Sequence, residues 1–261
     1  EEVLDEDQIV VSASQIEILS NNEVQTDLIH LDNSRHVKHA YPEGGYVQKV
    51  YNTDGILLRT IQEDAPNAIT GDVSSTITYV DGSYDTIVRS QNGDYASRRM
   101  SVLGVQLYQT VVVATTTTTT YANGSMELSR VNDEGEIVET VTLSAPNQDN
   151  QQTRVTKNEN KTVRVYLMHG VKINEQIDDR SVRIYITYAA DQAGSGYAVN
   201  KSTNEPLYTL TVTNGVIRRT YPNGNVEIET VLNDTTKEVR GEDENGQLLY
   251  LHETEDNIER I

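Results

Sequence analysis

One short pattern recurs along this chain: a Tyr, two further residues, a Gly, and then a strand-like run that leads to a second turn. The four copies are Tyr41–Gly44, Tyr79–Gly82, Tyr121–Gly124 and Tyr221–Gly224. In the first three, a second Gly follows at the same offset (Gly55, Gly93 and Gly135), and Asn233-Asp234 takes that place in the fourth. Each copy therefore predicts a tight turn, a strand, a second tight turn and a second strand, which is a repeated β-hairpin.

Turn-forming dipeptides divide the rest of the chain at short intervals. They are Asp54-Gly55, Asp81-Gly82, Asn92-Gly93, Asn123-Gly124, Asn214-Gly215, Asn223-Gly224 and Asn245-Gly246. Such pairs accept the positive φ angles of the type I′ hairpin turn, and the intervening residues alternate between apolar and polar, as in Ser181–Tyr188. The sequence predicts an all-β protein: an antiparallel meander of hairpins that forms a sandwich, a barrel or an extended sheet.

One segment departs from this pattern of short strands separated by turns. Gln106–Tyr121 contains no turn residue and predicts a single long strand of about 50 Å, since each residue of a strand advances the chain by ~3.3 Å. Its Thr tract, Thr115–Thr120, predicts a solvated strand surface, with a dense array of O-linked glycans as the alternative.

Composition shifts suggest four regions along the chain. Residues 1–35 form an N-terminal arm with an irregular linker, Ser20–Arg35, and residues 36–143 form a first β region. Residues 144–152 read SAPNQDNQQ, which is polar, lacks alternation and predicts a linker loop. A second β region then covers residues 153–261.

Charge and cysteine content exclude several classes of function. The formal net charge is −19, which opposes binding to nucleic acid or to an anionic membrane. No apolar run reaches the ~18 residues of a membrane-spanning helix. The absence of Cys excludes disulfides, zinc thiolate sites and cysteine nucleophiles. The chain starts with Glu1 and shows no signal peptide, as expected of a mature secreted chain.

No constellation of residues points to catalysis. Ser195 lies in AGSGY, which lacks the G-x-S-x-G pattern of a nucleophile elbow. His36 and His39 are three residues apart in a predicted strand, where they face opposite sides and cannot share a metal. The acidic turns Glu242–Gly246 and Asn132–Gly135 could bind a divalent cation weakly, but they lack the spacing of an EF-hand loop. We therefore expect no enzyme activity, no cofactor and no dedicated metal site.

Four Asn-x-Ser/Thr sequences could accept N-linked glycans. They begin at Asn123, Asn160, Asn200 and Asn233. All four fall in predicted turns or polar loops, where a bulky sugar can be accommodated. They predict a glycosylated protein at the cell surface or outside the cell.

The N-terminal arm carries its own alternating pattern, outside the repeated hairpins. In Gln8–Leu19, Ile9, Val11 and Ala13 alternate, and Ile16 and Ile18 continue in the opposite phase. Such a strand can close its own sheet or pair with the edge of a neighbouring subunit. In this respect Gln8–Leu19 resembles the donor strands of pilus and fimbrial subunits. The resemblance implies subunit contacts through Ile9, Val11, Ala13, Ile16 and Ile18.

These features predict a structural subunit of a secreted, glycosylated filament or surface assembly, joined to copies of itself by β-strand addition. The alternative is a carbohydrate-binding or adhesin-type β module, whose 15 Tyr residues would stack on sugars.

Overall fold

The computed structural model describes residues 2–4, 10–19, 21–232, 236–255 and 258–260. The chain divides into two compact units, Glu1–Ala122 and Asn123–Ile261, which are called unit 1 and unit 2 below. All regular secondary structure in the described residues is β-strand, so the all-β prediction is confirmed.

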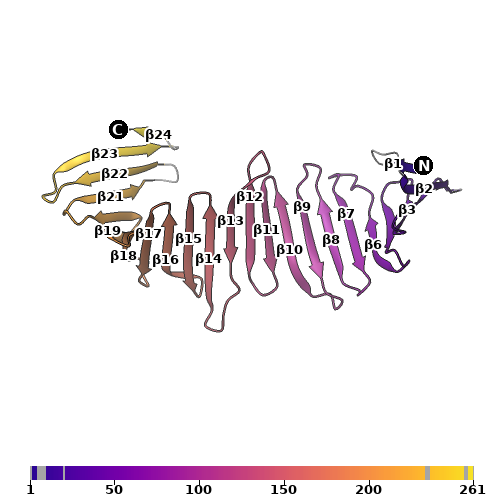
Figure 1. The fold of residues 1–261 in the computed structure, drawn as a ribbon, viewed down its shortest axis with the longest axis horizontal. Helices are drawn as coiled ribbons and strands as arrows, with labels where there is room; N and C mark the ends of the chain where they lie inside the picture. The colour runs from indigo at the N-terminus through magenta and orange to yellow at the C-terminus, as the bar shows by residue number, and fades with distance from the viewer. Residues whose placement is uncertain (1, 5–9, 20, 233–235, 256–257, 261) are drawn as a thin grey trace. The chain divides into compact units, whose positions relative to one another are not determined.

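In unit 1, each strand pairs antiparallel with the strand that precedes it (Figure 1). The strands are β1 (Glu2–Leu4), β2 (Val10–Ile18), β3 (Val24–His30), β4 (Arg35–Ala40), β5 (Tyr46–Tyr51), β6 (Leu57–Glu63), β7 (Val73–Tyr79), β8 (Tyr84–Arg89), β9 (Tyr95–Met100), β10 (Gln106–Val113) and β11 (Thr116–Tyr121).

Unit 2 continues the same meander pattern within its own residues. Its strands are β12 (Met126–Val131), β13 (Ile137–Leu143), β14 (Gln151–Asn158), β15 (Lys161–Met168), β16 (Val171–Asp179), β17 (Val182–Tyr188), β18 (Gly194–Asn200), β19 (Pro206–Thr213), β20 (Val216–Thr220), β21 (Val226–Val231), β22 (Thr236–Glu242), β23 (Leu248–Glu255) and β24 (Ile258–Arg260). Residues 144–150 of the predicted linker 144–152 connect β13 to β14, which pair directly with each other, and Gln151 and Gln152 already belong to β14.

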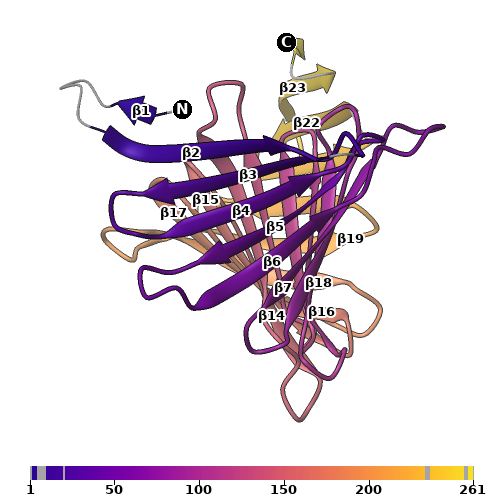
Figure 2. The ribbon, with the colours of Figure 1, turned by 90° about the vertical axis from the view of Figure 1, so that its right-hand side faces the viewer.

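Each unit is a single-layered extended sheet. Among the described strands of a unit, contacts join only strands that follow one another in the sequence. No second layer covers either face, and no late strand returns to pair with an early one, so neither unit is a sandwich or a closed barrel. Figure 2 shows this open arrangement for β2 to β7.

The Tyr-x-x-Gly repeat forms one recurring turn. At Tyr41, Tyr79 and Tyr221, the Gly N–H donates to the Tyr carbonyl, and the Tyr N–H donates to the carbonyl of the residue after the Gly. The glycines of all four copies have positive φ, as predicted: 98° at Gly44, 82° at Gly82, 81° at Gly124 and 87° at Gly224. The left-handed Gly therefore reverses the chain at each repeat.

The predicted type I′ geometry is wrong for most of these turns. A type I′ turn needs two consecutive residues with positive φ, and among the seven dipeptides only Asn214-Gly215 has both, at 51° and 79°. In the others only the Gly is left-handed, as in a type I turn followed by a residue in the αL conformation. The loop of the Tyr-x-x-Gly turns is longer than the two residues of the dipeptide. It is closed by the hydrogen bond from the Tyr N–H to the carbonyl of the residue after the Gly.

The second turn predicted in the first three copies is confirmed: the Gly55, Gly93 and Gly135 N–H groups donate to the carbonyls of Asn52, Ser90 and Asn132, so the same hydrogen-bonded turn also occurs without Tyr. One series of these turns begins at Tyr41 and Asn52, and another begins at Tyr79, Ser90 and Ser101. In both series, the first residues of consecutive turns are eleven positions apart. Eleven residues make one strand and one turn, and this spacing gives neighbouring strands the same length.

Two predictions about local structure were wrong. Gln106–Tyr121 is a hairpin, in which β10 and β11 pair from Val113↔Thr116 to Tyr108↔Tyr121. The chain reverses at Ala114, which takes a left-handed φ of 49° without any Gly or Asn. Ser20–Arg35 is not irregular, because it contains β3, which pairs with both β2 and β4.

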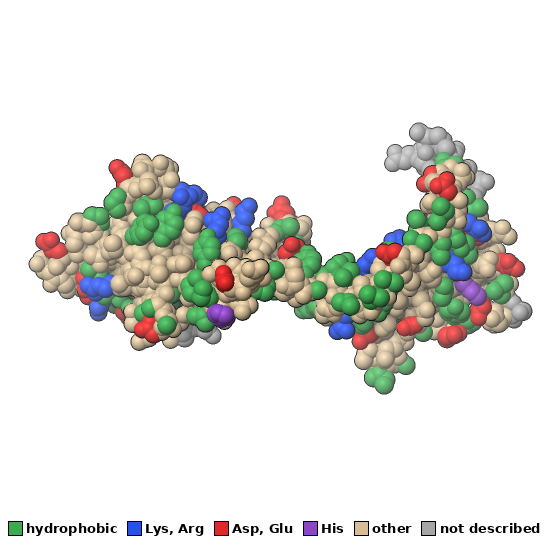
Figure 3. Space-filling model, turned by 90° about the horizontal axis from the view of Figure 1, so that it is seen from below, with side chains coloured by type: hydrophobic (Ala, Val, Ile, Leu, Met, Phe, Trp, Pro, Cys, Tyr) green, Lys and Arg blue, Asp and Glu red, His purple; other side chains and the backbone are tan. Residues whose placement is uncertain are grey.

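The apolar core is small and lies mostly in unit 2. Seven apolar residues are buried among those whose burial the structure describes, and of these only Val50 belongs to unit 1. The remaining six are Val165, Ile186, Ala198, Val199, Leu210 and Val226. Many other apolar side chains stay on the surface, as Figure 3 shows for one face. The sheets are therefore held mainly by their backbone ladders and by contacts between side chains of adjacent strands.

A glycine pair in β18 allows the sheet of unit 2 to bend where its core is concentrated. A Cβ atom at Gly196 would lie 1.9 Å from the carbonyl oxygen of Tyr185, and one at Gly194 would lie 3.0 Å from the Ile186 side chain. Beyond this point, β21 to β23 run in a different direction from β13 to β17 (Figure 1). The AGSGY segment thus shapes the sheet.

Replacing Gly124 by Val should lower the free energy of unfolding by about 1–2 kcal/mol, because a β-branched residue is strained at φ 81°. Urea unfolding followed by circular dichroism measures this loss. Ala122→Ser, in the same turn, serves as the control and should change the value far less. Equal losses for the two variants would show that the left-handed conformation does not matter.

Candidate functional site

The residues considered for chemistry do not form a reactive group. His36 pairs with Val50 and His39 with Val47, so the two imidazoles lie on opposite faces of the unit 1 sheet. Ser195 lies in β18 opposite Thr187 and Thr211. Among the described residues, no group of three or more His, Cys, Asp or Glu side chains could hold a metal ion.

The acidic segments considered for calcium are ordinary turns. Asp243 uses one carboxylate oxygen to accept the N–H groups of Asn245 and Gln247, at 2.9 and 2.8 Å. Asn132 accepts the N–H of Glu136 at 2.8 Å in the equivalent way. These oxygens therefore stabilise the chain reversals.

The strongest candidate for a functional site is the outer edge of β2 in unit 1. β3 pairs with β2 from Ser12 to Ile18, whereas β1 pairs only with Val10, Ser12 and Ala13. Figure 2 shows β2 at the margin of this sheet. Beyond the part that β1 covers, the described residues Gln15 to Ile18 have a strand partner on one side only.

The backbone of this edge is oriented for pairing. The N–H and C=O groups of Leu19 both bond within the turn to β3. Because these groups alternate in direction along a strand, those of Ile16 and Ile18 point away from β3. The side chains of Ile16 and Ile18 are 54% and 73% exposed. The edge therefore offers main-chain hydrogen bonds together with two apolar side chains.

A second edge of the same kind lies at β23 in unit 2. β22 pairs with β23 along its length, but β24 covers only Glu253–Glu255. A β-bulge places Leu248 and Leu249 together opposite Glu242, and the two leucines are each 54% exposed. Leu251 is 47% exposed. The sequence did not single out this edge, because LLYL looks like any buried strand until its pairing with β22 and β24 is known.

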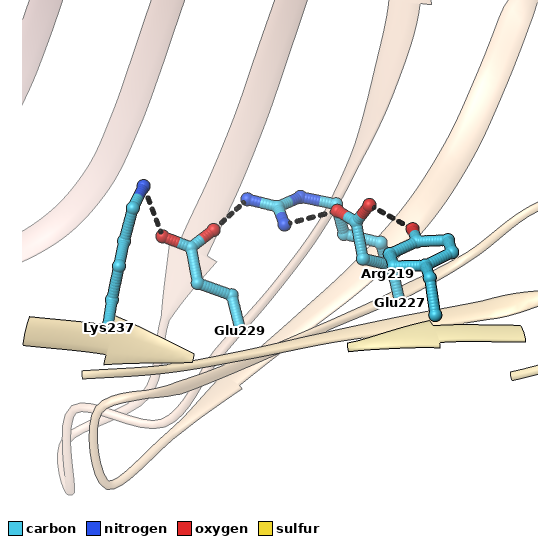
Figure 4. Close-up of polar contacts among 5 residues, drawn as sticks. Arg219, Glu227, Glu229 and Lys237 are labelled. Carbon is cyan, nitrogen blue, oxygen red and sulfur yellow. Dashed lines mark hydrogen bonds and ion pairs between the residues drawn. The ribbon is translucent and has the colours of Figure 1, made fainter. Parts of the chain in front are cut away.

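A chain of polar contacts anchors β23 to the three strands before it (Figure 4). Arg219 in β20 contacts Glu227 and Glu229 of β21, each at 2.7 Å. Lys237 of β22 approaches Glu229 at 3.5 Å. Burial raises the pKa of Glu229, but the hydrogen bond and charge of Arg219, assisted by Lys237, more than offset this and lower it overall. Arg219 therefore joins two carboxylates that would otherwise repel each other.

Tyr250 of β23 completes this chain of contacts. Its ring lies over Gly241 of β22, where a Cβ atom would come within 2.2 Å of the ring. The Tyr250 hydroxyl thereby reaches across β22 and donates to Glu227 in β21 at 2.7 Å. The hydrogen bond to Glu227, together with burial, raises the pKa of Tyr250 from 10.0 to about 12.

Three of the four predicted glycan acceptors lie in the described part of the chain, at or beside turns. Asn123 is exposed, and its side-chain oxygen accepts from the N–H and hydroxyl of Ser125 at 3.0 and 2.7 Å. Asn160 is exposed between β14 and β15. Asn200 is half-buried, and its side-chain oxygen accepts the N–H groups of Ser202 and Thr203.

Four of the predicted site residues are only partly covered by the structure, or not at all. Ile9 and Asn233 lie outside the described residues. Val11 and Ala13 are placed by their backbone within β2. Ile16 and Ile18 lie on the same face of β2, because they are two residues apart in a strand whose pairing with β3 is regular.

No protein-family model and no curated protein sequence matches the chain. Similar solved structures include the wild-type TCP10 domain of Danio rerio CPAP in complex with a peptide of Danio rerio STIL. That structure is 15% identical, with 92% of this chain and 98% of that chain covered and a TM-score of 0.27. The G-box domain of the microcephaly protein CPAP is 15% identical over 83% of this chain and 92% of its own, with a TM-score of 0.21. At these scores the likeness assigns no function to this chain.

The contact between Tyr250 and Glu227 should make the stability of unit 2 depend on alkaline pH. A tyrosine whose pKa is raised on folding contributes stability that is present below its unfolded pKa of about 10 and is lost as the pH rises towards 12. Urea unfolding at a series of pH values should show this loss.

Glu227→Gln removes the charge that holds the phenol protonated, so the pKa of Tyr250 should fall towards 10. Absorbance of the tyrosinate anion, compared between wild type and Tyr250→Phe, isolates this one group among the tyrosines. A Tyr250 that ionises together with the exposed tyrosines in the wild type would contradict the contact.

Proposed function

We propose that this protein is a structural subunit that joins copies of itself by β-strand addition at two edges. The outer edge of β2, with Ile16 and Ile18, and the outer edge of β23, with Leu251, are the two surfaces. The observation that carries the proposal is the presence in one chain of two long strands that are each covered on the outside only by a three-residue strand. Exposed, apolar edges of this kind are templates for pairing with another chain.

The two edges differ in sequence, so an interface between β2 of one copy and β23 of another is heterologous. Such an interface leaves an unused edge at each end and can therefore continue into a filament. Each junction would supply backbone hydrogen bonds and bury apolar side chains that are exposed in one copy. The net charge of −19 opposes association at low ionic strength, so salt should favour assembly.

The remaining parts of the proposal concern where this assembly works. We place it outside the cell or at the cell surface, with glycans on the turns, and assign it no catalytic activity. The exposure of Asn123 and Asn160 supports glycosylation, since both acceptors are accessible at the ends of strands. The described residues contain no helix with the length and apolar character needed to span a membrane.

Proline substitutions at the two edges test the assembly. The Ile16 N–H points away from β3 and the Leu251 N–H points away from β22, so Pro removes an outward donor without breaking the ladder within the chain. Ile16→Pro and Leu251→Pro should each remain folded, and each should be monomeric in sedimentation velocity under conditions where the wild type polymerises. Ile69→Lys is the control, since this loop side chain is 95% exposed and lies on neither edge.

Mixing the two variants tests the direction of pairing. Ile16→Pro retains an intact β23 edge and Leu251→Pro retains an intact β2 edge, so an equimolar mixture should form dimers and nothing larger. Dimers formed by either variant alone would show that like edges pair, which overturns the heterologous arrangement. A wild type that stays monomeric at all concentrations and salt conditions would overturn the assembly itself.

Glycosylation predicts a mass above that of the polypeptide. Intact mass spectrometry of the native protein should exceed 29.1 kDa, and Asn123→Gln or Asn160→Gln should remove one glycan each. Peptide-N-glycosidase treatment should lower the native mass by the mass of the N-linked glycans. A native mass equal to the bare polypeptide would contradict both the N-linked and the Thr-tract O-linked proposals.

A further inference from the structure

One face of the unit 2 sheet carries three tyrosines around a shallow groove. Tyr185 of β17 lies directly opposite Tyr197 of β18, with ring centroids 5.2 Å apart and a tilt of 34°. Tyr166 of β15 shares this face, since it pairs with Asn174, which pairs with Thr187. Together these residues line a groove of about 390 Å³. Tyr197 and Tyr166 are 50% and 38% exposed, so their rings are available to a ligand.

Amide side chains lie between the aromatic rings. Asn174 and Gln176, both in β16, line the groove between Tyr166 on one side and Tyr185 on the other. Gln176 donates one amide hydrogen to Asp178 at 2.9 Å, which fixes the orientation of its side chain. An amide can both donate and accept a hydrogen bond, as a sugar hydroxyl can, and this makes the pair suitable for a polyhydroxylated ligand.

The charges around the groove compensate one another. Asp178 is held by Arg164 at 2.8 Å and by Arg183 at 2.6 Å. The side chain of Glu175 lies on the opposite face of β16, where it is paired with Lys172 at 3.0 Å and accepts the Tyr188 hydroxyl at 2.7 Å. A groove whose ions are already paired offers little to a strongly charged ligand, so its chemistry favours a neutral one.

We propose that this groove binds a neutral, extended chain of pyranose sugars. A pyranose ring has a face of C–H groups that packs on an aromatic ring, while its hydroxyls point outward to polar groups such as Asn174 and Gln176. Tyr166 and Tyr185 lie two strands apart, ~10 Å across the sheet. That separation suits two sugar units of an extended chain lying across the strands, with Tyr197 continuing the aromatic surface.

Titration calorimetry with cellohexaose, a neutral extended oligosaccharide, tests the proposal on the full chain. Wild type should bind it, and Tyr197→Ala and Tyr166→Ala should each weaken binding about ten-fold, a loss of the size expected for one stacked ring. Tyr197→Phe and Tyr166→Phe keep the ring and should bind close to wild type. Tyr108→Ala, in unit 1, is the matched control and should bind unchanged.

Circular dichroism of each variant shows whether the sheet is intact, and the Phe variants keep the test valid if an Ala variant unfolds. Absence of cellohexaose binding in the wild type would overturn the proposal. So would binding that the two groove tyrosines do not affect, binding of maltohexaose alone, or binding of a hexaproline peptide in preference to the sugar. The measurement is made with Ile16→Pro as background, so that its outcome does not depend on self-assembly.

Discussion

The whole structure depends on the register of its backbone ladders, because almost nothing else holds the strands. Among the residues whose burial the structure describes, only seven apolar side chains are buried, and contacts between the described strands show no second layer over either sheet. A shift of one residue in a single strand would turn its side chains to the other face. Register is set by the turns, in which a left-handed Gly and two backbone hydrogen bonds fix where each strand begins. The turn is therefore the main source of specificity in this fold.

A single-layered open sheet has two edge strands that the sheet itself does not cover. A barrel removes its edges by closing on itself, and a sandwich can cover them, but a single layer keeps a first and a last strand. Many proteins protect such strands with Lys, Pro or inward-pointing charges. Here the outer strands instead carry exposed Ile16, Ile18, Leu248, Leu249 and Leu251. On its inner side, in contrast, β23 is linked to the preceding strands by the contacts of Tyr250 with Glu227 and of Glu227 with Arg219.

The sequence predicted those parts of the fold that local chemistry determines. Gly44, Gly82, Gly124 and Gly224 have the predicted positive φ, because no other residue reverses the chain at so little cost. The hairpin at Ala114 was missed, since a left-handed Ala between Val and Thr residues has no signature and is imposed by the pairing of β10 with β11. The type of turn was wrong for a similar reason. A dipeptide does not show how many flanking residues take part in the reversal, and the hydrogen bonds of Tyr and of the residue after Gly decided it.

Candidate sites were predictable only where one strand contains them. Ile16 and Ile18 alternate within β2, so their common face follows from the sequence alone. Tyr166, Tyr185 and Tyr197 come together across β15 to β18, and their alignment depends on a register shift that follows Tyr166 in its pairing with β16. Without that bulge, Tyr166 would pair with Ile173 in place of Asn174 and would lie on the other face from Asn174. One irregular position therefore decides which side chains meet across four strands. Such a groove follows from the pairing of the strands, and the alternation within a single strand does not predict it.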